Sequence, residues 1–457
     1  MSNQPTDTPL GASGDPEIVT KAGFGTWLKG VVYTGLRSGW LVSILAVVIA
    51  FAIGALLIAM TGASVTEAYY NMFRGAIFNP NGRNFAYQIK PLTDSFFYAI
   101  PLILGGLGLA FGFRAGLFNI GGAGQLVFGA LAAAWVGFNY DFPPVIHTIL
   151  AVLAGLVAGA LYASIAGILK ARTGANEVIV TIMLNSISGL ALSYILLQPS
   201  WQVPGTNFPK TPNVADTAAM TPLLDAPFKI HSGILLAILA TVVFWWILER
   251  STFGFEVRAV GANPDAARTA GISVGRVTIL TMVVSGSFLG MAGANEALGT
   301  IGYVSGNVAG NVGFDAITVA LLGRNKPIGT FFAGLLFGAF KAGGYIMQNA
   351  GVPIDMILIL QSTIVLLIAA PALVRWIFRL PKFNNITLRQ YVTLSERGME
   401  VNQVNANALI EEEVERAGAA PEDEHVPVRD ESRIRVGEKT VDNDGPEDMT
   451  HEGGEQR

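Results

Sequence analysis

The sequence predicts an all-α polytopic membrane protein with about ten transmembrane helices and a disordered acidic tail. Apolar residues make up 51% of the chain and charged residues only 14%, whereas about a quarter of a soluble protein is charged. Long apolar runs recur between residues 40 and 380, and about 20 apolar residues suffice to cross a bilayer. The charges are also segregated. Residues 381–457 hold 18 acidic and 9 basic side chains, while residues 1–380 hold 15 and 20.

Three segments follow from this distribution. Residues 1–39 are polar to mixed, and the first apolar run starts at Trp40. The apolar core of a cleavable signal peptide lies nearer the N-terminus, so we expect residues 1–39 to form an uncleaved cytoplasmic arm. Residues 40–380 are expected to form the transmembrane domain. Residues 381–457 are too poor in apolar side chains to bury a core, which predicts a disordered acidic cytoplasmic tail.

Ten apolar segments are expected to cross the membrane. In chain order they are 40–60, 96–113, 126–138, 147–169, 177–197, 233–248, 277–298, 314–323 extended into the preceding stretch 299–313, 328–347 and 356–378. Lys and Arg are more frequent in cytoplasmic loops than in outer loops. With the N-terminus inside, the inner loops collect Arg114, Lys170, Arg172, Arg250, Arg258, Arg268, Arg276, Arg324 and Lys326. Both termini are therefore expected in the cytoplasm.

Several kinds of chemistry have no support in the sequence. There is no cysteine, so disulfide and thiolate chemistry are excluded. The four histidines are scattered, and we expect no metal site. The phosphate-binding pattern G-x-x-x-x-G-K-[ST] is missing, and no pairing of a nucleophile with a base stands out. We therefore expect a chain that is not an enzyme, holds no cofactor of its own and binds no nucleic acid.

Polar residues inside the apolar segments are the first candidates for function, because ionisable groups at membrane depth mark transport paths. Two glycine-interrupted stretches, 116–124 and 299–313, point to a binding site between two halves of the domain. Amide side chains also act as links between helices, and Glu177 and Asp315 also suit helix starts, so both interpretations remain open. Lys341 stands near the middle of an apolar segment. The candidate translocation residues are Asn119, Gln125, Glu177, Asn185 and Asp315.

A polar stretch, residues 251–276, separates two apolar segments. Asn263 suits an N-cap and Pro264 the first helical position, while Gly271 can end the helix. A helix of about two turns is too short to be stable alone, so it must dock against something. It is either an ordinary cytoplasmic loop or a coupling helix on which a soluble partner acts, with small residues that permit close approach.

Four motifs, in order along the chain, resemble the permease subunits of bacterial ABC importers. They are residues 113–125 (FRAGLFNIGGAGQ), 169–185 (LKARTGANEVIVTIMLN), 254–268 (GFEVRAVGANPDAAR) and 313–323 (GFDAITVALLG). The branch is the one that holds ribose and branched-chain amino acid permeases, and nucleoside (simple sugar) permeases look most similar. The resemblance covers about residues 40–380 and leaves out the arm and the tail.

The resemblance implies a type II ABC importer permease fold in a bacterial cell membrane. It implies an ABC ATPase subunit that binds ATP, a second homologous permease subunit, an extracytoplasmic substrate-binding lipoprotein and surrounding membrane lipid. Nucleosides are the implied substrates, and simple sugars are the alternative substrates. Two other classes of function stay open: a secondary transporter or channel, and a membrane scaffold that acts through its tail. The coupling segment would include Gly254, Arg258, Gly261, Asn263, Pro264, Ala266, Ala267 and Gly271.

Overall fold

The computed structural model describes residues 28–29, 31–33, 39–203, 205, 208–353 and 355–380. All of them fall within one compact unit, residues 28–384. The expected acidic tail and most of the N-terminal arm lie outside the described residues, so the disorder of the tail stays a prediction. Among the described residues every regular element is a helix, and the only β-pairings are the isolated bridges Lys210↔Ser305 and Pro222↔His231.

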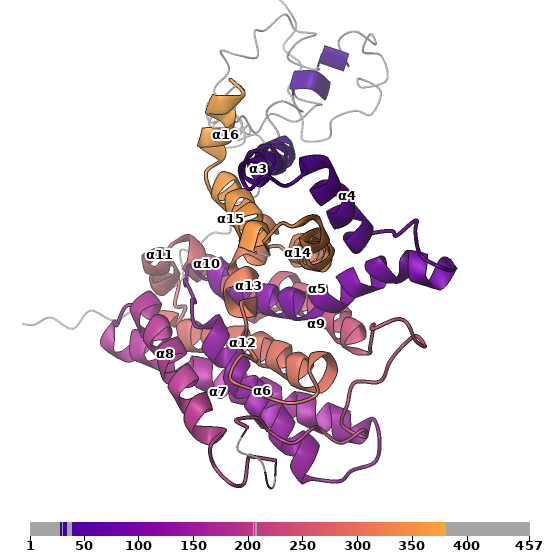
Figure 1. Ribbon diagram of the computed structural model, residues 1–457. Helices are drawn as coiled ribbons and strands as arrows, with labels where there is room; N and C mark the ends of the chain where they lie inside the picture. Colours follow the sequence, from indigo (N-terminus) through magenta and orange to yellow (C-terminus); the bar gives the residue numbers. More distant parts are fainter. Residues whose placement is uncertain are drawn as a thin grey trace, which may run out of the picture. The chain divides into compact units, whose positions relative to one another are not determined.

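The helices follow the expected apolar segments closely. In chain order they are α3 (Gly39–Met60), α4 (Val65–Ala76), α5 (Phe85–Arg114), α6 (Gly122–Asn139), α7 (Ile146–Thr173), α8 (Glu177–Ile195), α9 (Gly233–Arg250), α10 (Thr252–Ala262), α11 (Pro264–Thr269), α12 (Val274–Asn295), η1 (Glu296–Thr300), α13 (Val312–Leu322), α14 (Pro327–Met347), η2 (Gln348–Ala350), α15 (Asp355–Ala369) and α16 (Pro371–Ile377) (Figure 1).

Six stretches of the described chain are long and apolar enough to cross a membrane. They are α5, α7, α8, α9, α12 continued through η1, and α14 continued through η2. The part of the chain that the structure describes is therefore built from helices, six of which have the length and composition of membrane spans. α3, α6, α13 and α15 coincide with the other four expected segments, although α13 is short for a complete crossing.

Three helix boundaries differ from the expected segments. α5 begins at Phe85 rather than at residue 96, because Asn84 caps it and Lys90 pairs with Asp94 one turn later on the same helix. α13 begins at Val312 and so uses only the end of the glycine-rich stretch. The last expected segment is broken into α15 and α16 at Pro371, since proline disfavours a helical conformation in the residue before it.

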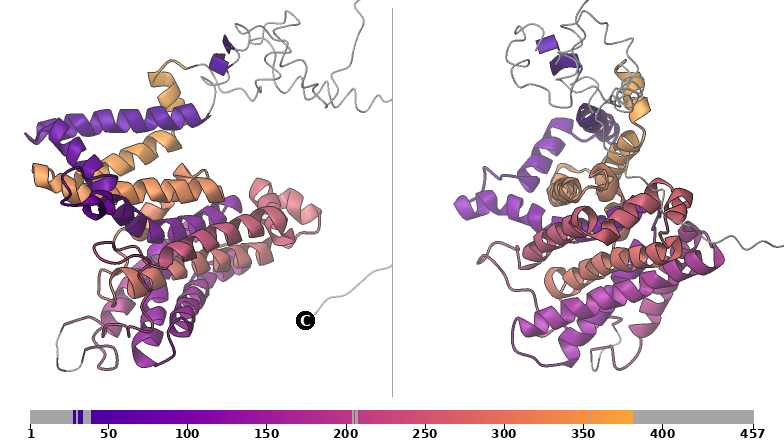
Figure 2. Two further views of the ribbon diagram at one scale, coloured as in Figure 1. Left: turned by 90° about the vertical axis from the view of Figure 1, so that its right-hand side faces the viewer. Right: turned by 180° about the vertical axis from the view of Figure 1, so that it is seen from behind.

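Glycines bring the central helices close together. α12 contacts α7, α6 and α5, and α14 contacts α5 and α4. A Cβ atom on Gly290 would lie 2.2 Å from the Gly155 carbonyl oxygen, and one on Gly159 would lie 2.4 Å from that of Gly286. Small residues at such contacts let backbones approach, which is how helices associate in lipid. The long helices run side by side in both views of Figure 2.

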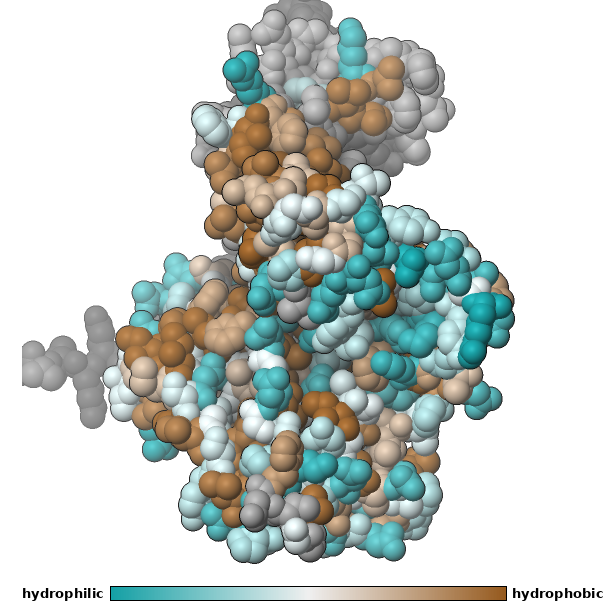
Figure 3. Space-filling view, in the orientation of Figure 1, coloured by the Kyte–Doolittle hydropathy of each residue, from teal (hydrophilic) through white to brown (hydrophobic). Residues whose placement is uncertain are grey.

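α8 exposes many apolar side chains and buries two polar ones beside Leu184 and Leu192. Its buried face includes Thr181 and Ser188, whereas the exposed face carries Ile179, Met183, Ile187, Leu190 and Tyr194. This reversal of the pattern of soluble proteins suits a helix whose outer side meets lipid or another membrane helix. Figure 3 shows hydrophobic side chains likewise covering α15 and α16, and hydrophilic ones around the beginning of α5.

Candidate functional site

The connection between α5 and α6, residues 115–121, is irregular backbone held by buried amides. Asn119 is fully buried and Gln125 is 1% exposed. The Asn119 amide nitrogen donates to Gln125 Oε1 at 3.1 Å and to Ser285 Oγ of α12 at 3.0 Å. Asn119 Oδ1 accepts the Gly121 N–H at 2.9 Å and the Gln125 amide at 3.1 Å. The turn is thereby tied both to itself and to α12.

A stripe of polar side chains on α8 holds the same turn from the other side. Glu177, Thr181 and Asn185 are spaced by four residues and so lie on one face of the helix. Glu177 Oε1 accepts the Phe118 N–H at 3.4 Å, and Thr181 Oγ1 accepts the Ile120 N–H at 3.3 Å.

Asn185 makes the strongest of these links, because it serves one backbone donor and one backbone acceptor. Its Oδ1 accepts the Gly124 N–H at 2.9 Å, and its amide donates to the Ile120 carbonyl at 2.8 Å. Gly121, the N-cap of α6, has no side chain to cap the helix. Asn185 therefore caps α6 from a neighbouring helix, satisfying backbone groups that would be costly to leave unpaired at membrane depth.

The structure thus gathers four of the five candidate translocation residues around one turn. Asp315 lies apart, in the first turn of α13, where Gly313 packs so closely that a Cβ there would be 2.5 Å from the Ala123 nitrogen. Glu177 and Asp315 both stand at helix starts, as expected. The hydrogen bonds of Asn119 and Asn185 link the turn to α12 and α8, and those of Gln125 hold Asn119. Contact of these residues with a substrate stays a prediction.

A second polar feature is a cavity of about 170 Å³ between α5, η1 and α14. Its lining includes Phe97, Tyr98, Glu296, Lys341 and Tyr345. The sequence singled out Lys341 as an ionisable residue in an apolar segment, but nothing in it indicated the aromatic residues. These aromatic residues come together only in the folded chain, because α5 and α14 are far apart in the sequence.

The polar stretch folds into two helices instead of one. α11 is the expected short helix: Asn263 Oδ1 accepts the Asp265 and Ala266 N–H groups, both at 3.0 Å, and Pro264 opens the helix. Gly271 follows in the left-handed conformation, with φ +84°, as expected for a closing glycine. The preceding residues, including Gly254 and Arg258, form the separate helix α10.

Gly261 and Ala267, both placed in the expected coupling segment, lie against other parts of this chain, although Gly261 itself is exposed. A Cβ on Gly261 would lie 2.1 Å from the Arg114 carbonyl oxygen, so a side chain there collides with α5 before it meets any partner. Ala267 is buried, whereas Ala266 is exposed. Of the two alanines, only Ala266 presents its side chain to a docking protein.

α10 is attached to the turn between α5 and α6. Glu249, at the end of α9, lies 3.5 Å from Arg114 and 3.7 Å from Arg258. A Cβ on Gly116 would lie 3.7 Å from the Gly261 Cα. Half-exposed ion pairs each contribute little to stability, so we attribute the attachment of α10 mainly to the close backbone contact of Gly261. The other side of the same turn is held by α8 and Asn119.

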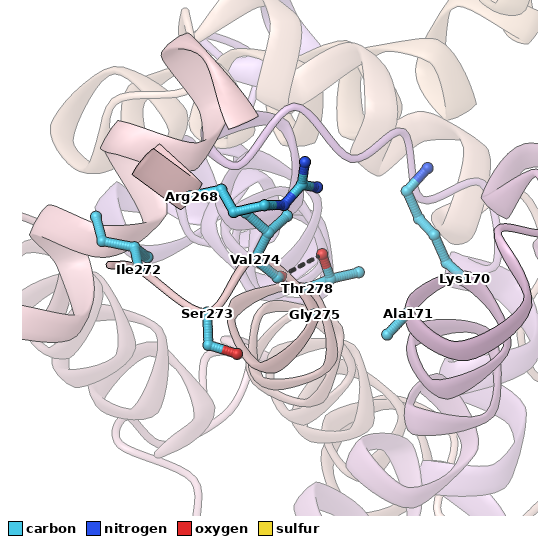
Figure 4. A pocket seen from close by; sticks show the side chains of 8 residues that line it. All are labelled: Lys170, Ala171, Arg268, Ile272, Ser273, Val274, Gly275 and Thr278. Atoms are coloured by element: carbon cyan, nitrogen blue, oxygen red, sulfur yellow. Dashed lines mark hydrogen bonds between the residues drawn. The ribbon is translucent and has the colours of Figure 1, made fainter. Parts of the chain in front are cut away.

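A cavity of about 410 Å³ lies beside α11. Figure 4 shows Arg268 of α11 and Lys170 of α7 on opposite sides of the first turn of α12. Lys170 also pairs with Glu177 at 2.6 Å, and Arg268 with Asp265 at 2.9 Å. The cavity thus lies between the coupling segment and Lys170, whose partner Glu177 begins the polar stripe of α8, and both of its cations are paired with carboxylates of this chain.

Comparisons with known proteins agree with this architecture. Residues 92–370 match the family described as branched-chain amino acid transport system / permease component. The guanosine ABC transporter permease protein NupP of Bacillus subtilis is 40% identical over 74% of this chain and 95% of its own length.

Two further relatives are a glucose ABC transporter permease protein of Haloferax volcanii and the nucleoside ABC transporter permease protein NupB of Lactococcus lactis. The first is 35% identical over 71% of this chain and 85% of its own length, and the second 34% over 72% and 90%. No solved structure matches. With the family model matching more than half of the chain, this protein is a member of the branched-chain amino acid transport system permease family.

Proposed function

We propose that this chain is the permease subunit of an ATP-driven importer and forms the translocation path for nucleosides. The observation that carries the proposal is the 40% identity to a guanosine permease protein over nearly that protein's whole length. A second relative, at 34%, is named for nucleosides as well. Simple sugars are the second candidate, because a glucose permease protein is 35% identical.

The proposed assembly contains an ABC ATPase subunit that holds the ATP, a second homologous permease subunit and an extracytoplasmic substrate-binding lipoprotein. The chain would cross a bacterial cell membrane ten times, with both termini in the cytoplasm. The six helices long and apolar enough to cross a membrane support this count, as do α3, α6, α13 and α15 at the remaining expected segments. The placement of Arg114, Lys170 and Arg268 at one set of helix ends supports the orientation.

We further propose that α11 receives the movement of the ATPase and that α10 passes it to the turn 115–121. The exposed Ala266 offers a close approach to a partner helix. The contact of Gly261 with the α5 carbonyl leaves no room for α10 to move without that turn. Since Asn119 ties the turn to α12 and Asn185 ties it to α8, a push on α10 would shift the polar centre of the domain.

The test is uptake by proteoliposomes that contain the complete importer, with guanosine, uridine, glucose and ribose as labelled substrates. The proposal expects uptake of the nucleosides that needs both ATP and the binding lipoprotein. Uptake of sugars alone would favour the second candidate. Nucleoside uptake that continues without ATP would show a secondary transporter or channel.

A further inference from the structure

The cavity between α5, η1 and α14 combines aromatic rings with two opposite charges inside an apolar domain. Resting on the proposed function, we propose that this cavity is a recognition site for the nucleobase. In this site the base packs against Tyr98 and Tyr345, Glu296 accepts hydrogen bonds from its N–H groups, and Lys341 donates to its carbonyl or ring nitrogen.

The aromatic side of the cavity is formed by residues from two helices. The Tyr98 and Tyr345 ring centroids lie 5.4 Å apart at an interplanar angle of 36°, and Phe97 lies edge-on to Tyr98 at 5.2 Å. Tyr345 is 44% exposed, so one ring remains open to a ligand. Aromatic faces bind any base by stacking, and a nucleoside therefore gains more from this wall than a sugar without a base.

The charged side of the cavity is poorly satisfied by the protein. Glu296 is buried, with 7% of its surface exposed, and Lys341 of α14 lines the same cavity. Among the described residues neither Glu296 nor Lys341 forms an ion pair or a side-chain hydrogen bond, although both line the same cavity. A buried carboxylate beside a partly buried ammonium is costly at membrane depth unless these groups gain polar partners, and a base edge supplies both a donor and an acceptor.

The size of the cavity limits which part of a substrate it takes. Pockets for whole drug-sized ligands measure about 300–1,000 Å³, whereas this one has about 170 Å³. It therefore suits one ring system, with the ribose extending toward the exposed residue Asn307 at the cavity rim. In the proposed orientation Lys341 and Tyr345 lie toward the outer end of α14, on the side from which a binding protein would deliver its load.

The experiment measures uptake of guanosine, uridine and glucose by cells that carry the complete importer, with the amount of permease in the membrane measured in parallel. The variants are Glu296→Gln, Lys341→Met, Tyr345→Leu and Tyr345→Phe. Tyr70→Leu is the matched control, since Tyr70 is 46% exposed and lies outside the cavity. We expect Tyr345→Leu to reduce the nucleoside transport rate per permease by about fivefold or more, and Tyr345→Phe to retain most of it.

Glu296→Gln and Lys341→Met should lower nucleoside uptake further and should change the preference between guanosine and uridine, because the two bases present different donors and acceptors to this edge. If Glu296→Gln fails to reach the membrane, the variants of the exposed Tyr345 still test whether the cavity recognises the base. Normal nucleoside uptake in Tyr345→Leu, or an equal loss in Tyr70→Leu, would overturn the site alone. A parent importer that carries glucose but no nucleoside would overturn both the site and the proposed function.

Discussion

Asn185→Leu removes the side chain that caps α6 from α8 and changes the shape of the site very little. It leaves the Gly124 N–H without its 2.9 Å acceptor and the Ile120 carbonyl without its 2.8 Å donor. Loss of a cap costs about 0.5–2 kcal/mol, and a buried unsatisfied group about 1–3 kcal/mol. Hydrogen bonds between membrane helices have measured nearer 0.6 kcal/mol, so we expect a total loss of about 2 kcal/mol.

The assay is equilibrium unfolding of the purified permease in mixed detergent and SDS micelles. The matched control is Ser193→Ala, since Ser193 also lies on α8 but is exposed and bonds only to its own helix, at the Gly189 carbonyl. The control should unfold within about 0.5 kcal/mol of the parent. If Asn185→Leu is as stable as the parent while transport falls, then Asn185 faces the substrate and the capping argument is wrong.

The remaining predictions use the same unfolding assay. Burial lowers the pKa of His231 to about 4, whereas histidine in the unfolded chain has a pKa near 6.5. The stability from neutral His231 should be fully present above pH 6.5 and should fall by on the order of 3 kcal/mol as the pH drops to about 4. His231→Leu should lose this pH dependence. Gly290→Ala should destabilise the helix packing, whereas Gly189→Ala, with open space around it, should be neutral or slightly stabilising. Gly261→Ala should lower stability through its internal clash, while Ala266→Arg should unfold like the parent yet uncouple ATP hydrolysis from uptake.

Local features of this protein were predictable from sequence because their causes lie within a few residues. The cap Asn263 bonds to N–H groups two and three residues later, and Pro264 and Gly271 stand where a short helix begins and ends. The apolar segments were also located well, since span length and composition are properties of one stretch. The beginning of α5 was not predicted, because the charged residues Lys90 and Asp94 give this stretch the low hydropathy that is typical of a loop.

The long-range features were not predictable in the same way. Asn119, Gln125 and Asn185 were identified as unusual polar residues, but their bonding to one turn depends on α8 packing beside α6. The inward direction of Gly261 and Ala267 likewise depends on how α10 lies on α5. Periodicity within one helix cannot supply that placement, and for the same reason the aromatic wall of Tyr98 and Tyr345 escaped sequence reasoning.

The most direct test of the central claim uses the absence of cysteine in this chain. A single cysteine at Ala266 would be the only thiol of the permease, on the exposed side of α11. The measurement is ATP-dependent nucleoside uptake by the complete importer before and after a bulky thiol reagent reaches the cytoplasmic side, with the cysteine-free parent permease in the same assembly as the control. The account predicts that modification abolishes uptake only in Ala266→Cys. Unchanged nucleoside uptake after complete modification would contradict it.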